Sequence, residues 1–170
     1  AMLSQAQALA RKHSAEVPWI NSPMQDLSQR LDDKFDLILC LGNSIPHLLT
    51  QADLDAALSG FAQLLQPNGI LLIQLLNYHK ILDTKERIVA VTRTHDTEYI
   101  RFYDFLPELI QFNLLTITWQ NNQPQSTLTS TPLFPYTTDT LTNPLSQHNF
   151  STINTYGDLN FNPFDKNESP

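Results

Sequence analysis

The chain has 170 residues, 41% of them hydrophobic, and its 17 acidic and 10 basic side chains give a formal net charge of −7. This length and apolar content suit one folded domain and argue against disorder. The negative charge, with the basic residues scattered singly or in pairs, argues against a nucleic-acid partner.

The single cysteine, Cys40, lies inside an apolar run, so an internal disulfide is impossible and Cys/His metal spacing is absent. We therefore expect a reducing, cytoplasmic setting. The strongly apolar runs reach only about eight residues, which is too short to cross a bilayer, and no signal peptide is visible. No membrane partner is expected.

The first half of the chain predicts alternating helices and strands. Residues 1–14 have helical spacing, and residues 16–22 read as a short strand, followed by a polar loop with one helical turn. Residues 35–42 and 69–76 predict two strands that are apolar on both faces, with a helix at 51–66 between them. This order predicts a parallel sheet with a right-handed crossover.

After residue 80 the pattern changes to alternation with period two. Residues 87–106 predict two strands around a turn at His95-Asp96, and residues 109–120 and 126–134 predict two more. Together they predict an antiparallel sheet over residues 87–135.

The last part of the chain predicts a helix and a strand. Residues 137–150 favour a short helix that leaves through a left-handed Asn149, and residues 151–161 favour a strand. We therefore expect one α/β domain over residues 1–170. Its parts are a parallel core (1–80), an antiparallel insertion (87–135) and a returning helix–strand unit (137–161).

Small and polar residues follow the first buried strand at once. Gly42 allows a ligand to approach the backbone closely, and open parallel sheets bind ligands at the carboxyl ends of their strands. Asn43 and Ser44 offer hydrogen bonds there, and His47 offers a ring face or a donor. The alternative is a plain strand-to-loop turn, capped by Asn43 and Ser44 and made rigid by Pro46.

Asn77 and Tyr78 follow the second buried strand. If the two strands are neighbours, these residues lie beside Asn43, where Tyr78 is placed to orient a substrate or stack on it. The alternative is that Asn77 caps a turn and Tyr78 packs in the core.

Arg101 alternates with Ile100 and Phe102, so it can point into a cavity beneath the antiparallel segment and pair with an anionic substrate group. The alternative, which the sequence favours, is a surface ion pair with Asp104 or Glu98. No glycine-rich phosphate loop, nucleophile elbow, zinc motif or carboxylate pair is present, and the five histidines are dispersed. We therefore predict neither a metal site nor a specific catalytic residue.

One stretch, residues 35–48 (FDLILCLGNSIPHL), resembles the class I S-adenosylmethionine-dependent methyltransferases, specifically their glycine/sarcosine N-methyltransferase-like branch, which carries a GNSxxHL element after its fourth strand. Four further elements match the family in the right order. They are SPMQDL, LLQPNGILLIQ, NYHKIL and NFSTINTYGD. The resemblance covers nearly the whole chain and implies a Rossmann-like parallel sheet, with the antiparallel insertion on the substrate side.

The first ten residues, AMLSQAQALA, resemble the helix that follows the family's second strand. The resemblance therefore implies that the first strand, the glycine-rich cofactor loop and the ribose-binding acid lie before residue 1, and that a closing strand is missing at the far end. An incomplete sheet exposes the edge of a strand, so we expect self-association through that edge.

The resemblance also implies the site residues. Ser22, Pro23 and Met24 match positions at the adenine of the cofactor. Leu41 and Gly42 match backbone contacts to its methionine part, and His47 matches a position near the crevice.

On the substrate side the resemblance implies Asn43, with Asn77 and Tyr78 beside it. Glycine-specific members carry an arginine where this chain has Leu76, so glycine is a poor candidate substrate, and Arg101 is a candidate replacement charge.

These matches imply methyl transfer from S-adenosylmethionine to a nitrogen or oxygen of a small-molecule acceptor. Such a displacement depends mainly on alignment and needs no dedicated base, and residues 87–135 would form a lid that excludes water. Two alternatives stay open. One is a non-catalytic methyltransferase-like fragment or module that cannot bind cofactor alone, and the other is an unrelated small-ligand α/β protein.

Overall fold

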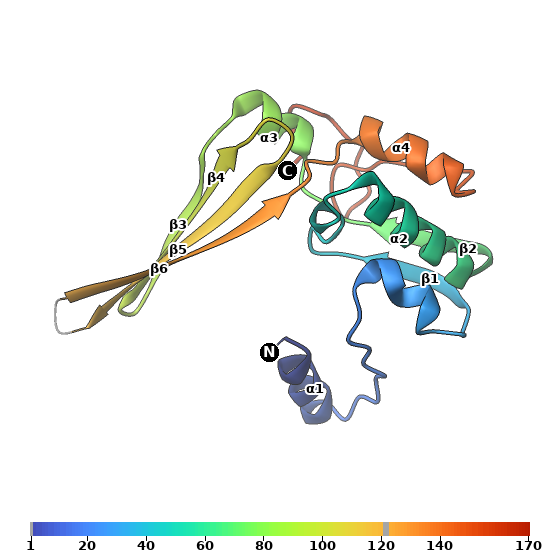
Figure 1. Ribbon diagram of the computed structural model, residues 1–170, viewed down its shortest axis with the longest axis horizontal. Helices are drawn as coiled ribbons and strands as arrows, with labels where there is room; N and C mark the ends of the chain where they lie inside the picture. The colour runs from blue at the N-terminus through green and yellow to red at the C-terminus, as the bar shows by residue number, and fades with distance from the viewer. Residues whose placement is uncertain (1, 121–122) are drawn as a thin grey trace.

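The computed structural model describes residues 2–120 and 123–170. Figure 1 shows an α/β core from which a long antiparallel sheet projects to one side. The predicted α/β class, with a small parallel sheet and a separate antiparallel sheet, is confirmed.

The parallel part consists of β1 (Phe35–Cys40), α2 (Gln51–Leu64) and β2 (Leu65–Ile73). The two strands pair in parallel from Leu37↔Ile70 to Cys40↔Ile73, as predicted. Thr50 caps α2, because its hydroxyl accepts the backbone N–H of Asp53 at 3.1 Å. The buried face of α2 then covers one face of the strands through Leu54, Ala57, Leu58 and Phe61.

The segment before β1 contains less regular structure than expected. Helix α1 (Met2–Lys12) and the 3₁₀ turn η1 (Met24–Gln29) are confirmed, but residues 16–22 do not form a strand. A strand needs a neighbour for its backbone groups, and Pro18 lacks the N–H of a ladder. Among the described residues β1 pairs with β2 alone, and α1 lies apart from the core (Figure 1).

The antiparallel sheet has the order β3-β4-β5-β6. Its strands confirm the period-two prediction: they are β3 (Ile88–Thr94), β4 (Thr97–Phe105), β5 (Ile110–Gln120) and β6 (Gln123–Leu133). Part of the predicted polar break before β6, at residues 121–122, lies outside the described residues. The sheet is long and narrow, so its far end extends beyond the helices (Figure 1).

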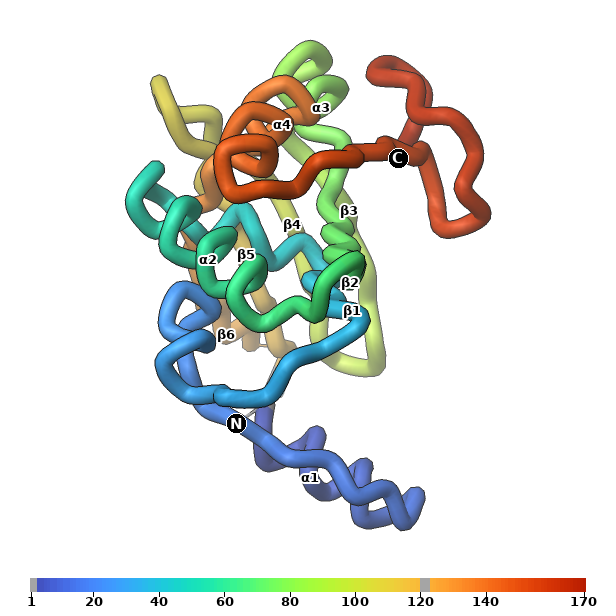
Figure 2. The backbone as a smooth tube through the Cα atoms, turned by 90° about the vertical axis from the view of Figure 1, so that its right-hand side faces the viewer, coloured from blue at the N-terminus to red at the C-terminus, as the bar shows by residue number. Residues whose placement is uncertain are grey.

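Two short helices complete the fold. The sequence did not predict α3 (Tyr78–Thr84), whereas α4 (Thr138–Gln147) and the left-handed Asn149 (φ 68°) are confirmed. Thr137 and Thr140 form a reciprocal capping box at the start of α4. Figure 2 shows α4 beside α2.

The strand predicted at residues 151–161 is wrong, since this region forms only an isolated bridge between Tyr156 and Pro163. The carboxylate of Asp158 accepts the backbone N–H groups of Asn160 and Asn162, at 2.8 and 3.2 Å, and bends the chain into a turn. Asp and Asn side chains that bond nearby backbone compete with strand pairing in this way.

Candidate functional site

The ends of β1 and β2 are joined side by side beyond the regular ladder. Gln74 donates its backbone N–H to Cys40 and accepts the N–H of Asn43, at 2.9 and 3.2 Å. Its side-chain Oε1 accepts the N–H of Gly42 at 2.7 Å. Gln74 therefore holds the turn after β1 against the end of β2. The sequence reasoning missed this residue, because a glutamine in a strand has no distinctive pattern.

Asn43 connects the same two strand ends through its side chain. Its Oδ1 accepts the N–H of Leu76 at 3.1 Å, and its Nδ2 donates to the hydroxyl of Tyr78 at 2.9 Å. Its backbone is left-handed (φ 58°), a conformation that asparagine tolerates better than most residues. The structure therefore brings Gly42, Asn43 and Tyr78 together beyond the carboxyl ends of β1 and β2.

Tyr78 is almost fully buried, with 1% of its surface exposed. Its phenol pKa is raised to about 12, mainly by burial; the hydrogen bond from Asn43 partly opposes the shift, and Tyr103 adds to it. The phenol is therefore neutral near pH 7, so it acts as a hydrogen-bonding group and not as a base. It packs with Tyr103 and Ile110 in a small core cluster where α3 meets the antiparallel sheet.

Asn77 is the N-cap of α3, as the capping alternative predicted. Its Oδ1 accepts the N–H of Lys80 at 3.3 Å. Its Nδ2 donates to the backbone carbonyls of Lys166 and Ser169, both at 3.0 Å, while only 6% of the residue is exposed. The Asn77 amide therefore anchors the C-terminal segment and has both of its donors occupied.

A cavity of about 390 Å³ opens beside the end of β1. Met24 and Leu41, both expected at the cofactor, line it together. The other lining residues are Leu27, Ile38, Leu39, Cys40, Ser44 and Phe61. Next to it, Gly42 (φ 72°) has no atom within 4 Å of the position that a Cβ would occupy, so a ligand has room against its backbone.

The remaining expected cofactor residues do not line this cavity. Ser22 donates its hydroxyl to the carbonyl of Pro23, and Pro23 is the N-cap of η1. His47 is exposed in the 3₁₀ turn η2 (Ile45–His47). A larger cavity of about 580 Å³ lies between α1 and residues 15–19, where no residue from the strand ends lines it.

Arg101 does not form the ion pair that the sequence favoured. Strand alternation places it on the opposite face of the sheet from Glu98 and Asp104, which pair with Arg93 and Arg87 instead. Arg101 donates to the hydroxyl of Thr92 at 3.1 Å. It shares its face of the sheet with Tyr103, which packs against Tyr78.

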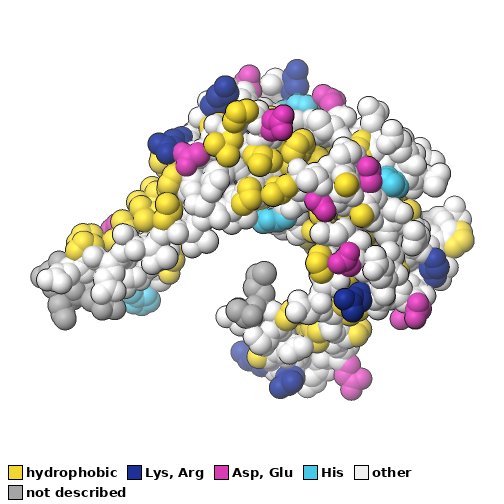
Figure 3. Space-filling view, viewed as in Figure 1, with side chains coloured by type: hydrophobic (Ala, Val, Ile, Leu, Met, Phe, Trp, Pro, Cys, Tyr) yellow, Lys and Arg dark blue, Asp and Glu magenta, His cyan; other side chains and the backbone are white. Residues whose placement is uncertain are grey.

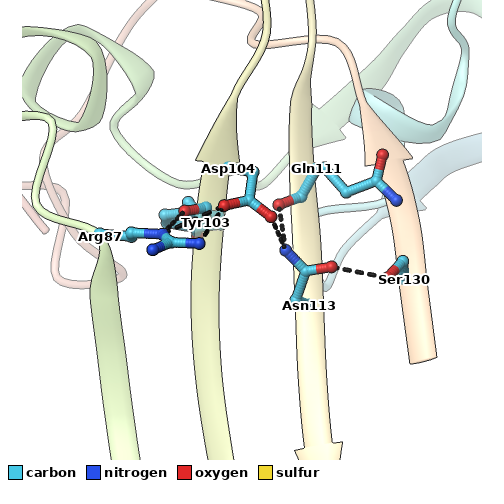
Figure 4. Close-up of polar contacts among 6 residues, drawn as sticks. All are labelled: Arg87, Tyr103, Asp104, Gln111, Asn113 and Ser130. Carbon is cyan, nitrogen blue, oxygen red and sulfur yellow. Dashed lines mark hydrogen bonds and ion pairs between the residues drawn. The ribbon is translucent and has the colours of Figure 1, made fainter. Parts of the chain in front are cut away.

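A row of polar side chains crosses the other face of the sheet (Figure 4). Asp104 accepts from Nε of Arg87 at 3.1 Å and from Nδ2 of Asn113 at 2.8 Å, and Asn113 accepts from the hydroxyl of Ser130 at 2.6 Å. Asn113 is only 2% exposed, and the row satisfies its buried amide while joining β4, β5 and β6 to Arg87, the residue immediately before β3. The sequence reasoning missed the row, since its members come from different segments of the chain.

Two negative findings hold for the described residues, 2–120 and 123–170. No group of three or more His, Cys, Asp or Glu side chains is arranged to hold a metal ion. Their helices are all too short or too polar to cross a membrane.

Comparisons with known proteins show which proteins this chain is similar to. Residues 1–69 match the family described as "Methyltransferase domain". The chain is 26% identical over 163 residues to a glycine/sarcosine N-methyltransferase of Halorhodospira halochloris, covering 93% of this chain and 57% of that protein. It is 36% identical over 67 residues to dTDP-3-amino-3,6-dideoxy-alpha-D-glucopyranose N,N-dimethyltransferase of Streptomyces fradiae, covering 39% of this chain and 26% of that protein.

The fold is also shared with solved structures. An S-adenosylmethionine-dependent methyltransferase from Clostridium acetobutylicum superposes with a TM-score of 0.74 at 16% identity, over 86% of this chain and 59% of that one. The chain thus spans about half the length of the curated relatives that it matches over most of its residues. Residues 1–69 thus match a methyltransferase domain, most of the chain is similar to glycine/sarcosine N-methyltransferases, and its fold is that of S-adenosylmethionine-dependent methyltransferases.

Proposed function

We propose that the protein transfers a methyl group from S-adenosylmethionine to a nitrogen of a small-molecule acceptor, and that this chain forms the adenine side and the acceptor side of the site. One observation supports the proposal above the others. Asn43 and Gln74 join the two strand ends directly beside the cavity that Met24 and Leu41 line.

The donor side fits S-adenosylmethionine in shape and chemistry. The side chains of Met24, Leu27 and Leu41 offer an apolar cavity suited to a flat adenine ring. The open space beside Gly42 suits the approach of the methionine part to the backbone. Ser22 and Pro23 lie immediately before Met24 and would border the adenine, and His47 would border the crevice.

When bound, S-adenosylmethionine supplies a methyl group on a positively charged sulfur. The protein then has to hold the acceptor in line with that methyl group and exclude water. Asn43 is suited to orient the acceptor, because its amide is fixed by Leu76 on one side and Tyr78 on the other. A neutral Tyr78 keeps this position from changing with pH near neutrality.

The choice of nitrogen comes from the relatives, whose names specify N-methylation of glycine, sarcosine or an amino sugar. Leu76 stands where the resemblance implies an arginine for glycine-specific members, so a free glycine carboxylate lacks its partner there. Among the described residues no carboxylate lies within ion-pair distance of Arg101, which lies on the face of the sheet that leads to Tyr103 and Tyr78. It is the candidate partner for an anionic group on the acceptor.

Calorimetry on the full-length gene product that carries this chain tests the donor side. We expect S-adenosylmethionine to bind with micromolar affinity. Replacing Leu41 with aspartate places a charge in the apolar cavity and should weaken binding by at least about tenfold. The control is Leu37→Asp, since Leu37 lies in the strand that Leu41 directly follows and is exposed to a similar extent (49%, against 47% for Leu41) but does not line the cavity.

Absence of binding by the full-length protein would refute the proposal and support the non-catalytic alternative. A radiolabelled methyl-transfer assay against glycine, sarcosine and amino sugars then tests the acceptor. Labelling only of hydroxyl compounds would refute the choice of nitrogen.

A further inference from the structure

Residues 156–169 close on themselves through hydrogen bonds between their own groups, and we call them the clamp. The N–H of Gly157 donates to the carbonyl of Asn162 at 2.7 Å. Asp165 and Ser169 are joined twice, because the N–H of Ser169 donates to the carbonyl of Asp165 at 2.9 Å and the N–H of Asp165 donates to the hydroxyl of Ser169 at 3.0 Å. The clamp therefore has a defined shape of its own, although it contains neither a helix nor a regular strand.

Gly157 lies at a point of close packing inside the clamp. A Cβ there would lie 2.5 Å from the hydroxyl oxygen of Ser169 and 2.9 Å from the carbonyl oxygen of Pro163. Both distances are too short for a real Cβ, so a side chain at this position forces its neighbours apart. Ser169 is also buried, with 8% of its surface exposed. A methyl group at residue 157 therefore opens the clamp from within.

The clamp is fastened to the first turn of α3. Asn77 donates its two amide N–H groups to the carbonyls of Lys166 and Ser169, both at 3.0 Å. Lys80 donates its ammonium group to the carbonyl of Glu168 at 3.4 Å. These three hydrogen bonds join one helical turn to the last part of the clamp, and Figure 1 shows the C-terminus beside α3.

The contacts of α3 with the antiparallel sheet are mainly apolar. Tyr78 packs with Tyr103 and Ile110, and Figure 3 shows hydrophobic side chains gathered where α3 meets the sheet and farther along it. Apolar contacts are non-directional, whereas a hydrogen bond requires a particular angle. On the side of α4, His79 adds a hydrogen bond between its Nε2 and the hydroxyl of Thr138 at 2.9 Å. The clamp therefore adds directional contacts that the apolar interface lacks.

Tyr78 connects the turn that the clamp holds to the strand ends. It directly follows Asn77 in the chain, and its hydroxyl accepts a hydrogen bond from the Asn43 amide at 2.9 Å. A hydrogen bond weakens steeply as its angle departs from linearity, so a rotation of this turn would release the Asn43 side chain on that side. The donor cavity, which Met24 and Leu41 line, includes no clamp residue among the residues that the structure describes. The acceptor side of the site is therefore joined to the clamp, and the donor side is separate from it.

We propose that the clamp positions the acceptor side of the site: by holding the first turn of α3 through Asn77, it sets the place of the Tyr78 hydroxyl and, through that hydroxyl, the orientation of the Asn43 amide. Gly157 and Ser169 are then positioning residues, since they act through Asn77 and Tyr78 and not on the acceptor itself. The inference rests on the proposed role of Asn43 in methyl transfer. It requires that loosening the clamp affects the acceptor and leaves the binding of S-adenosylmethionine unchanged.

Gly157→Ala in the full-length gene product tests the proposal, because the added methyl group opens the clamp while α3 and the strand ends keep their own residues. We expect kcat/KM for methyl transfer to sarcosine or amino sugars to fall by at least about tenfold, since a small misplacement of an orienting group has an effect of this size. The Kd for S-adenosylmethionine should change by less than about twofold. Nuclear magnetic resonance should show a shifted side-chain amide signal of Asn43, a readout that needs no activity.

The matched control is Gly69→Ala, which crowds the other end of the parallel strands. A Cβ at Gly69 would lie 2.9 Å from the side chain of Leu65 and 3.1 Å from the carbonyl oxygen of Phe35. This variant should lower Tm but leave the Asn43 signal and kcat/KM unchanged. The milder Ser169→Ala adds no bulk and removes the hydroxyl that accepts the N–H of Asp165, so it should shift the Asn43 signal in the same direction by a smaller amount.

Two results would overturn the proposal. The first is a folded Gly157→Ala or Ser169→Ala variant that keeps the Asn43 signal and the kcat/KM of the unaltered protein, which would make the clamp purely structural. The second is an equal loss of kcat/KM in Gly157→Ala and Gly69→Ala, which would mean that activity follows general stability. A full-length protein without any methyl transfer refutes the proposed function instead, and the Asn43 signal then still decides whether the clamp sets the position of that amide.

Discussion

Replacing Asn77 with serine separates two roles that the sequence could not distinguish. Serine keeps an oxygen for capping α3, but it removes the two N–H donors that reach the carbonyls of Lys166 and Ser169. Each lost hydrogen bond is worth about 0.5–1.5 kcal/mol, so Asn77→Ser should reduce the free energy of unfolding by about 1–3 kcal/mol. Asn77→Ala also removes the cap and should cost about 1 kcal/mol more.

In a domain of this size each kcal/mol lowers Tm by about 2–4 °C. Thermal denaturation should therefore show Tm falling in the order unaltered protein, Asn77→Ser, Asn77→Ala. Hydrogen exchange should show faster exchange at the amide of Ser169, whose N–H donates to Asp165 within the anchored segment. The matched control is Asn167→Ser in the same segment, which leaves both anchoring carbonyls in place.

The result that would refute this reasoning is specific. If Asn77→Ser leaves Tm and exchange unchanged but raises KM for the acceptor, then the Asn77 amide binds substrate and the anchoring role is wrong. If both stability and exchange change while KM is unaffected, the side chain is structural.

Three further predictions follow from the same geometry. Tyr78→Phe removes the hydroxyl that accepts a hydrogen bond from the Asn43 amide. It should therefore lower the free energy of unfolding by about 1–2 kcal/mol and kcat/KM by about tenfold. Unchanged kinetics would contradict the role of Asn43 in orienting the acceptor. Arg101→Met should raise KM for an anionic acceptor by about tenfold or more. The control is Arg93→Met on the other face of the sheet, which should leave KM unchanged. Equal effects of the two substitutions would show that Arg101 does not bind the acceptor. Burial raises the phenol pKa of Tyr78 and Tyr136 from 10.0 to about 12, so the stability that they contribute is present below pH 10 and is lost as the pH rises toward 12. Alkaline denaturation followed by circular dichroism should show that Tyr136→Phe loses less stability over this pH range than the unaltered protein does. An equal loss would mean that ionisation of Tyr136 does not destabilise the fold.

Hydrophobic periodicity alone predicted most of the secondary structure correctly. Alternation over residues 87–134 predicted the antiparallel strands, because the period of two is a local property of a strand with one apolar face. The same reasoning failed at residues 16–22 and 151–161. Strand formation there depends on a neighbouring strand to pair with, and a local pattern does not contain that information.

The sequence by itself determined the kinds of residue that follow each parallel strand, and therefore the resemblance to a family and the expectation of a shared site at Gly42 and Asn43. Only the tertiary structure decided what each side chain does there. It assigned Asn77 to the C-terminal segment, turned Arg101 away from Asp104, and brought Gln74 to Gly42. The physical reason is that a side chain's role depends on which partners lie within hydrogen-bonding distance, and those partners come from segments far away in the chain.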